Sequence, residues 1–100
     1  MKQKAVVLSP KDNVATALSP LESGDKLELK IEGKTFAVTV KSDIPFGHKF
    51  SLARIQKNSP VVKYGEVIGT ATKNISPGDY VHVNNVVSTR GRGDLERKRK

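Results

Sequence analysis

The sequence predicts a small, mostly β protein with one compact domain. Three observations support this class: the chain has only 100 residues, its apolar content of 36% is built mainly from Val, Leu and Ile, and apolar residues alternate through its centre. A chain of this length has room for a single core, and β-branched residues favour strands. We therefore expect short strands and turns, and neither a helical bundle nor a βαβ unit.

The first part of the chain is expected to hold one short strand and one single-turn helix. Residues 5–8, AVVL, form an apolar run that is typical of a strand. In residues 10–18, PKDNVATAL, Asp12 or Asn13 stands where a helix cap would, and apolar residues follow at helical spacing. A second single-turn helix is expected over residues 51–55, SLARI, which also begin with a capping residue.

The clearest element is a β-hairpin between residues 27 and 40. Apolar and polar residues alternate on both arms, and Gly33 supplies a permissive turn residue between them. The residues expected on its buried face are Leu27, Leu29, Ile31, Phe36, Val38 and Val40. Residues 61–71, VVKYGEVIGTA, predict a strand pair or a bent strand broken at Gly65, and the glycines there indicate close backbone approach.

A final strand is expected over residues 80–87, YVHVNNVV. If Val81 and Val83 face the core, a period of two places the intervening side chains together on the opposite face. Those side chains are Tyr80, His82 and Asn84. Such a row of polar groups suits a cleft, and it equally suits the wet face of a sheet.

A weak internal repeat relates the two halves of the chain. Residues 14–29 align without gaps to residues 68–83, which matches the Gly-Asp pair at Gly24 with the Gly-Asp pair at Gly78. A fainter third copy surrounds Asn58. Each copy is interpreted as an apolar anchor, a turn at Gly or Asn, and a strand that leaves the turn.

The net charge of +8 is unevenly distributed. Residues 90–100 carry six Lys or Arg against two acids, a net of +4. We therefore expect a folded domain at 1–89 and a flexible basic tail at 90–100. The other residues offer no aromatic platform for stacking bases, which argues against a nucleic-acid partner. The absence of Cys, and an N-terminal apolar run too short for a signal peptide or a membrane span, favour a cytoplasmic protein.

His48 is one of only two histidines, and it lies in the segment IPFGHKF at residues 44–50. Pro45 restricts the backbone before it and Gly47 frees it, so the segment fixes how the imidazole is presented. Two histidines do not complete a metal site, so further ligands are expected from substrate, water or another chain. No phosphate loop, dinucleotide fingerprint or nucleophile elbow is present. Lys49 and Arg54 could bind a substrate carboxylate near His48, because an anionic substrate needs compensating charge, although solvated side chains remain the default for both.

A resemblance to the SAF domain of altronate and galactarate dehydratases is carried by three strings, DNVATAL, IPFGHKFSLARI and VVKYGEVIGTATKNISPGDYVHVNNVVSTRGRGDL. The chain is also similar to the separate small subunit of related lyases such as sulfolactate sulfo-lyase. The motifs follow the family's order over nearly the whole chain. The resemblance implies a β-clip fold, in which short strands fold over on themselves with single-turn helices between them.

The resemblance also implies a chemistry, the elimination of water or sulfite from a polyhydroxylated acid with the help of a divalent metal, usually iron. It makes His48 and His82 the candidate catalytic residues and metal ligands. The residues expected to bind the substrate are Lys49, Asn84 and Arg90. Many relatives carry a histidine where this chain has Asn84, and a carboxamide is a weaker ligand for iron, which argues against a metal held by this strand.

Most of that family's machinery lies in a much larger domain. We therefore expect a small subunit that acts with a large catalytic subunit on altronate, galactarate, sulfolactate or a similar acid, and that is not active alone. Two other hypotheses stay open. A β-clip module can bind a carbohydrate or a protein partner without catalysis, because a fold does not determine function. The basic tail could bind nucleic acid, with an affinity that falls steeply as salt is raised.

Overall fold

The computed structural model describes residues 4–88, and every regular element within them is a β-strand. The strands are β1 (Ala5–Val6), β2 (Val14–Ala17), β3 (Lys26–Ile31), β4 (Lys34–Thr39), β5 (Lys49–Ser51), β6 (Pro60–Lys63), β7 (Glu66–Ala71), β8 (Tyr80–Val81) and β9 (Val86–Ser88). They form antiparallel sheets in the orders β1-β2-β5-β8, β3-β4 and β6-β7-β9. The mostly β prediction is confirmed. No helix that could cross a membrane occurs in this part of the chain.

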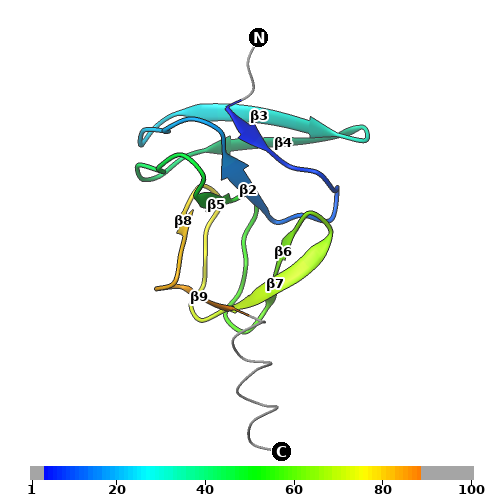
Figure 1. Ribbon diagram of the computed structural model, residues 1–100, viewed down its shortest axis with the longest axis vertical. Coiled ribbons are helices and arrows are strands. Elements are labelled where there is room, and N and C mark those ends of the chain that lie inside the picture. The colour runs from blue at the N-terminus through cyan, green and yellow to red at the C-terminus, as the bar shows by residue number, and fades with distance from the viewer. Residues whose placement is uncertain (1–3, 89–100) are drawn as a thin grey trace, which may run out of the picture.

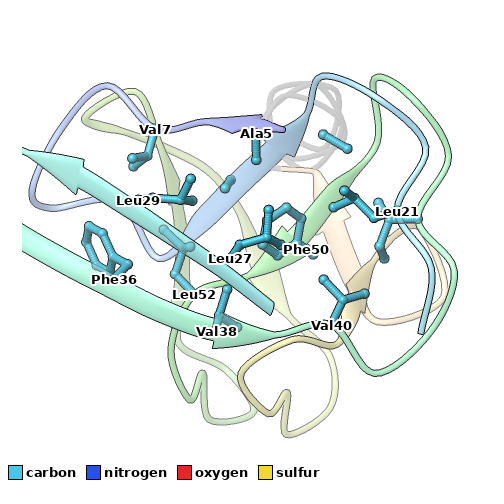
Figure 2. Close-up of a cluster of buried hydrophobic side chains, with 13 residues drawn as sticks. Ala5, Val7, Leu21, Leu27, Leu29, Phe36, Val38, Val40, Phe50 and Leu52 are labelled. Carbon is cyan, nitrogen blue, oxygen red and sulfur yellow. The ribbon is translucent and has the colours of Figure 1, made fainter. Parts of the chain in front are cut away.

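The three sheets are arranged along the molecule (Figure 1). The β3–β4 hairpin lies at one end, the sheet of β6, β7 and β9 lies at the other, and the four-stranded sheet lies between them. One cluster of buried apolar side chains joins the hairpin to the middle sheet around Phe50, which is fully buried (Figure 2). A second cluster joins the far sheet to the middle one through Val14 and Val81. Burial of this apolar area is the main stabilising contribution in a domain of this size.

The β3–β4 hairpin follows the alternating pattern of its sequence. The strands pair up to Ile31 opposite Lys34, which leaves Glu32 and Gly33 as a two-residue turn. Their φ values of 49° and 82° are those of a type I′ turn, the geometry that suits a hairpin. The face predicted to be buried is buried, except that Ile31 is partly exposed. Figure 2 shows this face turned toward the side chains of the middle sheet.

The other predicted strands are also present. The first strand, AVVL, is represented by β1, and the strand pair over 61–71 by β6 and β7, with the break at Tyr64 and Gly65. Gly69 shows the close approach expected of a glycine there. A Cβ at Gly69 would lie 2.6 Å from the carbonyl oxygen of Val87, so a larger residue would push β9 away from β7.

The two predicted single-turn helices are wrong. Residues 14–17 form β2. Of residues 51–55, Ser51 ends β5 (Lys49–Ser51), which pairs with β2, and Ile55 forms an isolated bridge with Ile75. The polar residues interpreted as helix caps do satisfy backbone groups, but in loops and strands. The carboxylate of Asp12 accepts three backbone N–H groups, one of them from Gly65 in the β6–β7 turn. The side chain of Asn13 bonds to the backbone of β6 through both its oxygen and its nitrogen.

The predicted continuous strand over 80–87 is interrupted. Its first two residues form β8, a turn follows, and the chain resumes as β9. Val83, expected in the core, is 82% exposed in this turn. Asn85 closes the turn, because its side-chain oxygen accepts the N–H of His82 at 2.9 Å and its nitrogen donates to the carbonyl of Tyr80 at 2.8 Å. Local bonds of this kind give the backbone an alternative to strand pairing.

The internal repeat corresponds to one turn geometry that the described residues contain four times. In each copy a buried aliphatic residue is followed, three positions later, by a residue whose φ lies between 74° and 97°. These residues are Gly24, Gly47, Asn58 and Gly78. A hydrogen bond from the residue after each of them closes the turn, as in type II turns. The fourth copy, IPFGHK, was missed by the sequence alignment.

The four turns work in two pairs. The anchors Leu21 and Ile44 exchange both backbone hydrogen bonds, each at 2.9 Å. The anchors Ile55 and Ile75 do the same at 2.9 and 2.7 Å. All four side chains are at most 2% exposed, so each bridge lies inside the protein.

Each turn also hydrogen-bonds to the residue that lies four positions before the anchor of the paired turn. At Gly78, the backbone N–H donates to the carbonyl of Ser51, and the carbonyl of Asp79 accepts the N–H of Ser51. The same two bonds recur in the other three turns, where the bound residues are Ala17, Val40 and Ala71. The repeated sequence pattern therefore reflects a repeated backbone hydrogen-bonding unit.

We predict that Gly78→Ala destabilises the domain far more than Gly24→Ala. Both glycines have a left-handed φ, 88° and 97°, so both variants incur about 1–2 kcal/mol of backbone strain. A Cβ at residue 78 would overlap the carbonyl oxygen of Thr39, whereas a Cβ at residue 24 meets nothing within 4 Å. Urea unfolding should show a loss of about 1–2 kcal/mol for Gly24→Ala and more than about 3 kcal/mol for Gly78→Ala. Equal losses would contradict this account of the packing.

We also predict that Asn85→Ala loosens the turn after β8, whereas Asn84→Ala leaves it intact. Two side-chain hydrogen bonds are lost only in Asn85→Ala, at a cost of roughly 1–3 kcal/mol. Amide hydrogen exchange checks this directly, since the His82 N–H donates to Asn85. Its exchange should accelerate in Asn85→Ala alone, and unchanged exchange in that variant would show that the turn forms without the side chain.

Candidate functional site

His48 is the fourth residue of the turn formed by residues 45–48. The sequence of this turn leaves the His48 side chain with no capping role. In the turns at Gly24 and Gly78 the fourth residue is an aspartate, whose carboxylate accepts the N–H of the turn's first residue at 2.9 and 2.8 Å. The first residue of the His48 turn is Pro45, which has no N–H to donate. A capping carboxylate would have no partner there, so the position is available for another side chain.

The imidazole of His48 meets two rings from β8 and the turn after it. Its Nδ1 is hydrogen-bonded to the hydroxyl of Tyr80, and the two ring centroids are 5.6 Å apart. The ring of His82 lies 5.5 Å from His48 and stacks on Tyr80 at 5.2 Å with an interplanar angle of 12°. The two histidines predicted to form one site therefore lie together. We call these three residues the His48–Tyr80–His82 cluster.

Strand pairing explains why this cluster forms. β5 and β8 are neighbours in the middle sheet, with Lys49 opposite Val81 and Phe50 opposite Tyr80. His48 immediately precedes one strand and His82 immediately follows the other, so antiparallel pairing brings both histidines to the same end of the pair.

The hydrogen bond to Tyr80 engages Nδ1 of His48 and leaves Nε2 to meet a ligand. The phenol O–H donates to Nδ1 when that nitrogen is unprotonated and accepts from it when it is protonated. His48 is partly buried, whereas His82 is exposed, so the two imidazoles differ in their access to solvent.

A cavity of about 350 Å³ opens beside the cluster. Its wall is formed by Lys49, Lys63, Ile68, Val81, His82, Val83, Val86 and Ser88. Of the residues predicted to bind substrate, only Lys49 lines it. Asn84 is exposed in the turn and is not part of the wall, and Arg90 lies outside the described residues.

Two residues of the site were missed by the sequence reasoning. Lys63 lines the cavity from the end of β6, a strand of another sheet, and no local pattern links it to Lys49. Asn85 positions the backbone of His82. A strand with a period of two would have placed Asn85 in the core beside Val83, and an unpartnered amide in a core is a signal that the strand must break.

The two lysines make the cavity cationic. Burial lowers the pKa of Lys49, and the nearby ammonium group of Lys63 lowers this pKa further. The Nζ atom of Lys63 lies 4.9 Å from the centroid of the Tyr64 ring, a cation–π contact. Within the part of the chain that the structure describes, no acidic side chain belongs to the wall of the cavity.

The described residues do not fit a metal centre by themselves. Within residues 4–88, no group of three or more His, Cys, Asp or Glu side chains is arranged to hold a metal ion. His48 and His82 supply at most two imidazoles, and Nδ1 of His48 is already bonded to Tyr80. A stable protein site commonly has three or four ligands.

The chain matches a family model described as the altronate/galactarate dehydratase SAF domain over residues 3–89. It is 38% identical over 80 residues to altronate dehydratase of Bacillus subtilis (strain 168) and 43% identical over 74 residues to altronate dehydratase of Escherichia coli (strain K12). These matches cover 80% and 74% of this chain but only 15% and 14% of the two dehydratases.

The chain is also similar to a shorter protein. It is 36% identical over 59 residues to (2R)-sulfolactate sulfo-lyase subunit alpha of Paracoccus pantotrophus, a match that covers 59% of this chain and 88% of that subunit. The resemblance drawn from the three sequence strings is thereby confirmed. The match over residues 3–89 spans every described strand, and the chain belongs to the altronate/galactarate dehydratase SAF domain family.

Proposed function

We propose that this chain is the small subunit of a metal-dependent sugar-acid hydro-lyase of the altronate or galactarate dehydratase type, acting in the cytoplasm with a separate large catalytic subunit. The observation that carries the proposal is the His48–Tyr80–His82 cluster beside a cationic cavity in a chain of this SAF family. The match to most of a sulfo-lyase alpha subunit supports the separate-subunit form.

Exposed apolar side chains beside the cluster support a partner chain. Phe46 is 66% exposed in the turn that leads to His48, and Val83 is 82% exposed directly after His82. Single exposed apolar residues are common on protein surfaces, but these two flank both histidines. A large subunit that covered them would bring its own catalytic groups to the cluster and exclude water from it.

The cluster suits the proton transfers of an elimination. The proton α to the substrate carboxylate leaves to a base, the C–H electron pair forms the new double bond, and the β hydroxyl departs as water after taking a proton from an acid. We assign the acid to His48 in its imidazolium form, whose Nε2–H proton passes to the departing hydroxyl while Nδ1–H stays hydrogen-bonded to the Tyr80 oxygen, leaving a neutral imidazole. His82 is the candidate base of this chain, because its imidazole is exposed and stacks on the ring of Tyr80. Lys49 orients the substrate carboxylate from the cavity wall.

In this proposal the metal belongs to the assembled enzyme. A divalent ion would supply Lewis-acid stabilisation of the enolate-like charge. His48 is bonded to Tyr80 through Nδ1 and donates its proton from Nε2, so it has no nitrogen left for the ion, and His82 contributes at most one ligand. The remaining ligands must come from the large subunit or the substrate.

The test is to co-express the chain with a large lyase subunit and to assay dehydration of altronate and galactarate with Fe²⁺. We expect activity only when both chains are present, and a loss of at least about 100-fold in the double variant His48→Ala and His82→Ala. Ser59→Ala is the matched control, because Ser59 occupies the place of His48 in another copy of the turn. This control should retain full activity.

Full activity of the double histidine variant would contradict the assignment of His48 and His82 to the active site. Binding of a sugar acid by this chain, with no large subunit able to associate, would instead favour the non-catalytic binding module considered from the sequence.

A further inference from the structure

The cavity beside the cluster gathers two cationic side chains from different sheets. Lys49 begins β5 in the four-stranded sheet, and Lys63 ends β6 in the three-stranded sheet. Both side chains are half-buried, and much of the surrounding wall is aliphatic, with Ile68 and Val86 among its residues. An apolar wall lowers the local dielectric constant and strengthens the interaction of a charge with whatever lies in the cavity.

Among residues 4–88, no side chain in the wall balances the charge of the two lysines. The other polar side chains there are His82 and Ser88, and neither is an acid. Glu66 is the cross-strand neighbour of Lys63, but it is exposed and does not line the cavity. An anionic group between the lysines would remove their mutual repulsion and accept charge-assisted hydrogen bonds from both.

We propose that Lys49 and Lys63 form an anion-binding subsite for the carboxylate or sulfonate end of a small organic acid. This inference rests on the proposed function, which supplies the substrate and the reacting cluster. His82 belongs both to the cavity wall and to the cluster, so an acid anchored at the lysines extends its next carbons toward the histidines. Lys63 is then a substrate-binding residue that no sequence motif indicated.

The wall also determines which part of the acid the subsite recognises. Aliphatic side chains offer no hydrogen bonds to sugar hydroxyls, and burying such hydroxyls without partners is unfavourable. The subsite therefore selects the anionic group, and the hydroxyls of a sugar acid must face the cluster and the partner chain.

Binding to the full chain tests the subsite without any catalysis. Tartrate and methanesulfonate serve as carboxylate and sulfonate probes, and neutral erythritol is the uncharged control, with the methyl NMR signals of Ile68 and Val86 as the readout. Both anions should shift these signals saturably, and erythritol should not. Lys63→Met should weaken anion binding at least about tenfold, which is a typical cost for losing one charge-assisted hydrogen bond. Lys57→Met, at an exposed lysine outside the cavity, should have no effect.

The absence of anion-dependent shifts, or equal weakening by Lys57→Met, would overturn the subsite. In the assembled enzyme, Lys63→Met should raise KM at least about tenfold and change kcat little. An active enzyme whose KM is unchanged by Lys63→Met would also reject the subsite and leave the proposed function standing. Saturable binding at Ile68 and Val86 that is lost in Lys63→Met, together with no lyase activity for any partner, would keep the subsite and reject the function.

Discussion

The fold depends on the backbone hydrogen bonds that join its turns in pairs. Leu21 and Ile44 exchange two bonds, Ile55 and Ile75 exchange two more, and all four side chains are buried. Each turn requires a positive φ at its third residue, so a Gly or Asn there is what allows the two anchors to meet. Strands of two to six residues are too short to be stable alone. Four strands, β3, β5, β6 and β8, begin directly after these turns, and they include strands of all three sheets.

The candidate site uses one of these turns without altering its backbone. His48 occupies the place that Asp25, Ser59 and Asp79 hold in the other turns, and its backbone makes the same hydrogen bonds as theirs. Only the side chain differs, and Pro45 removes the donor that a capping carboxylate would serve. One structural unit thus stabilises the fold in all four copies, and in the fourth it also presents the imidazole to which we assign the proposed chemistry. A candidate functional group is carried here without any change to the fold.

Local patterns predicted the parts of the structure that depend on local contacts. The hairpin between residues 27 and 40 was predicted because alternation and a turn glycine are signals within a single segment. The first helix assignment failed because Asp12 and Asn13, which look like helix caps in the local sequence, bind backbone groups about 50 residues away. The second failed because Ser51 pairs with a distant strand, β2. Both histidines of the site were predicted. Lys63 and Asn85 were not, because one lies on another sheet and the other acts by interrupting a strand.

The central claim is that the His48–Tyr80–His82 cluster is one half of a site that a larger chain completes. The most direct measurement is a cryo-EM structure of this chain bound to a large lyase subunit in the presence of a sugar acid. The expected result is an acid within hydrogen-bonding reach of His48, with Phe46 and Val83 covered by the large subunit. An acid bound wholly inside the large subunit, with both histidines facing solvent, would contradict the claim.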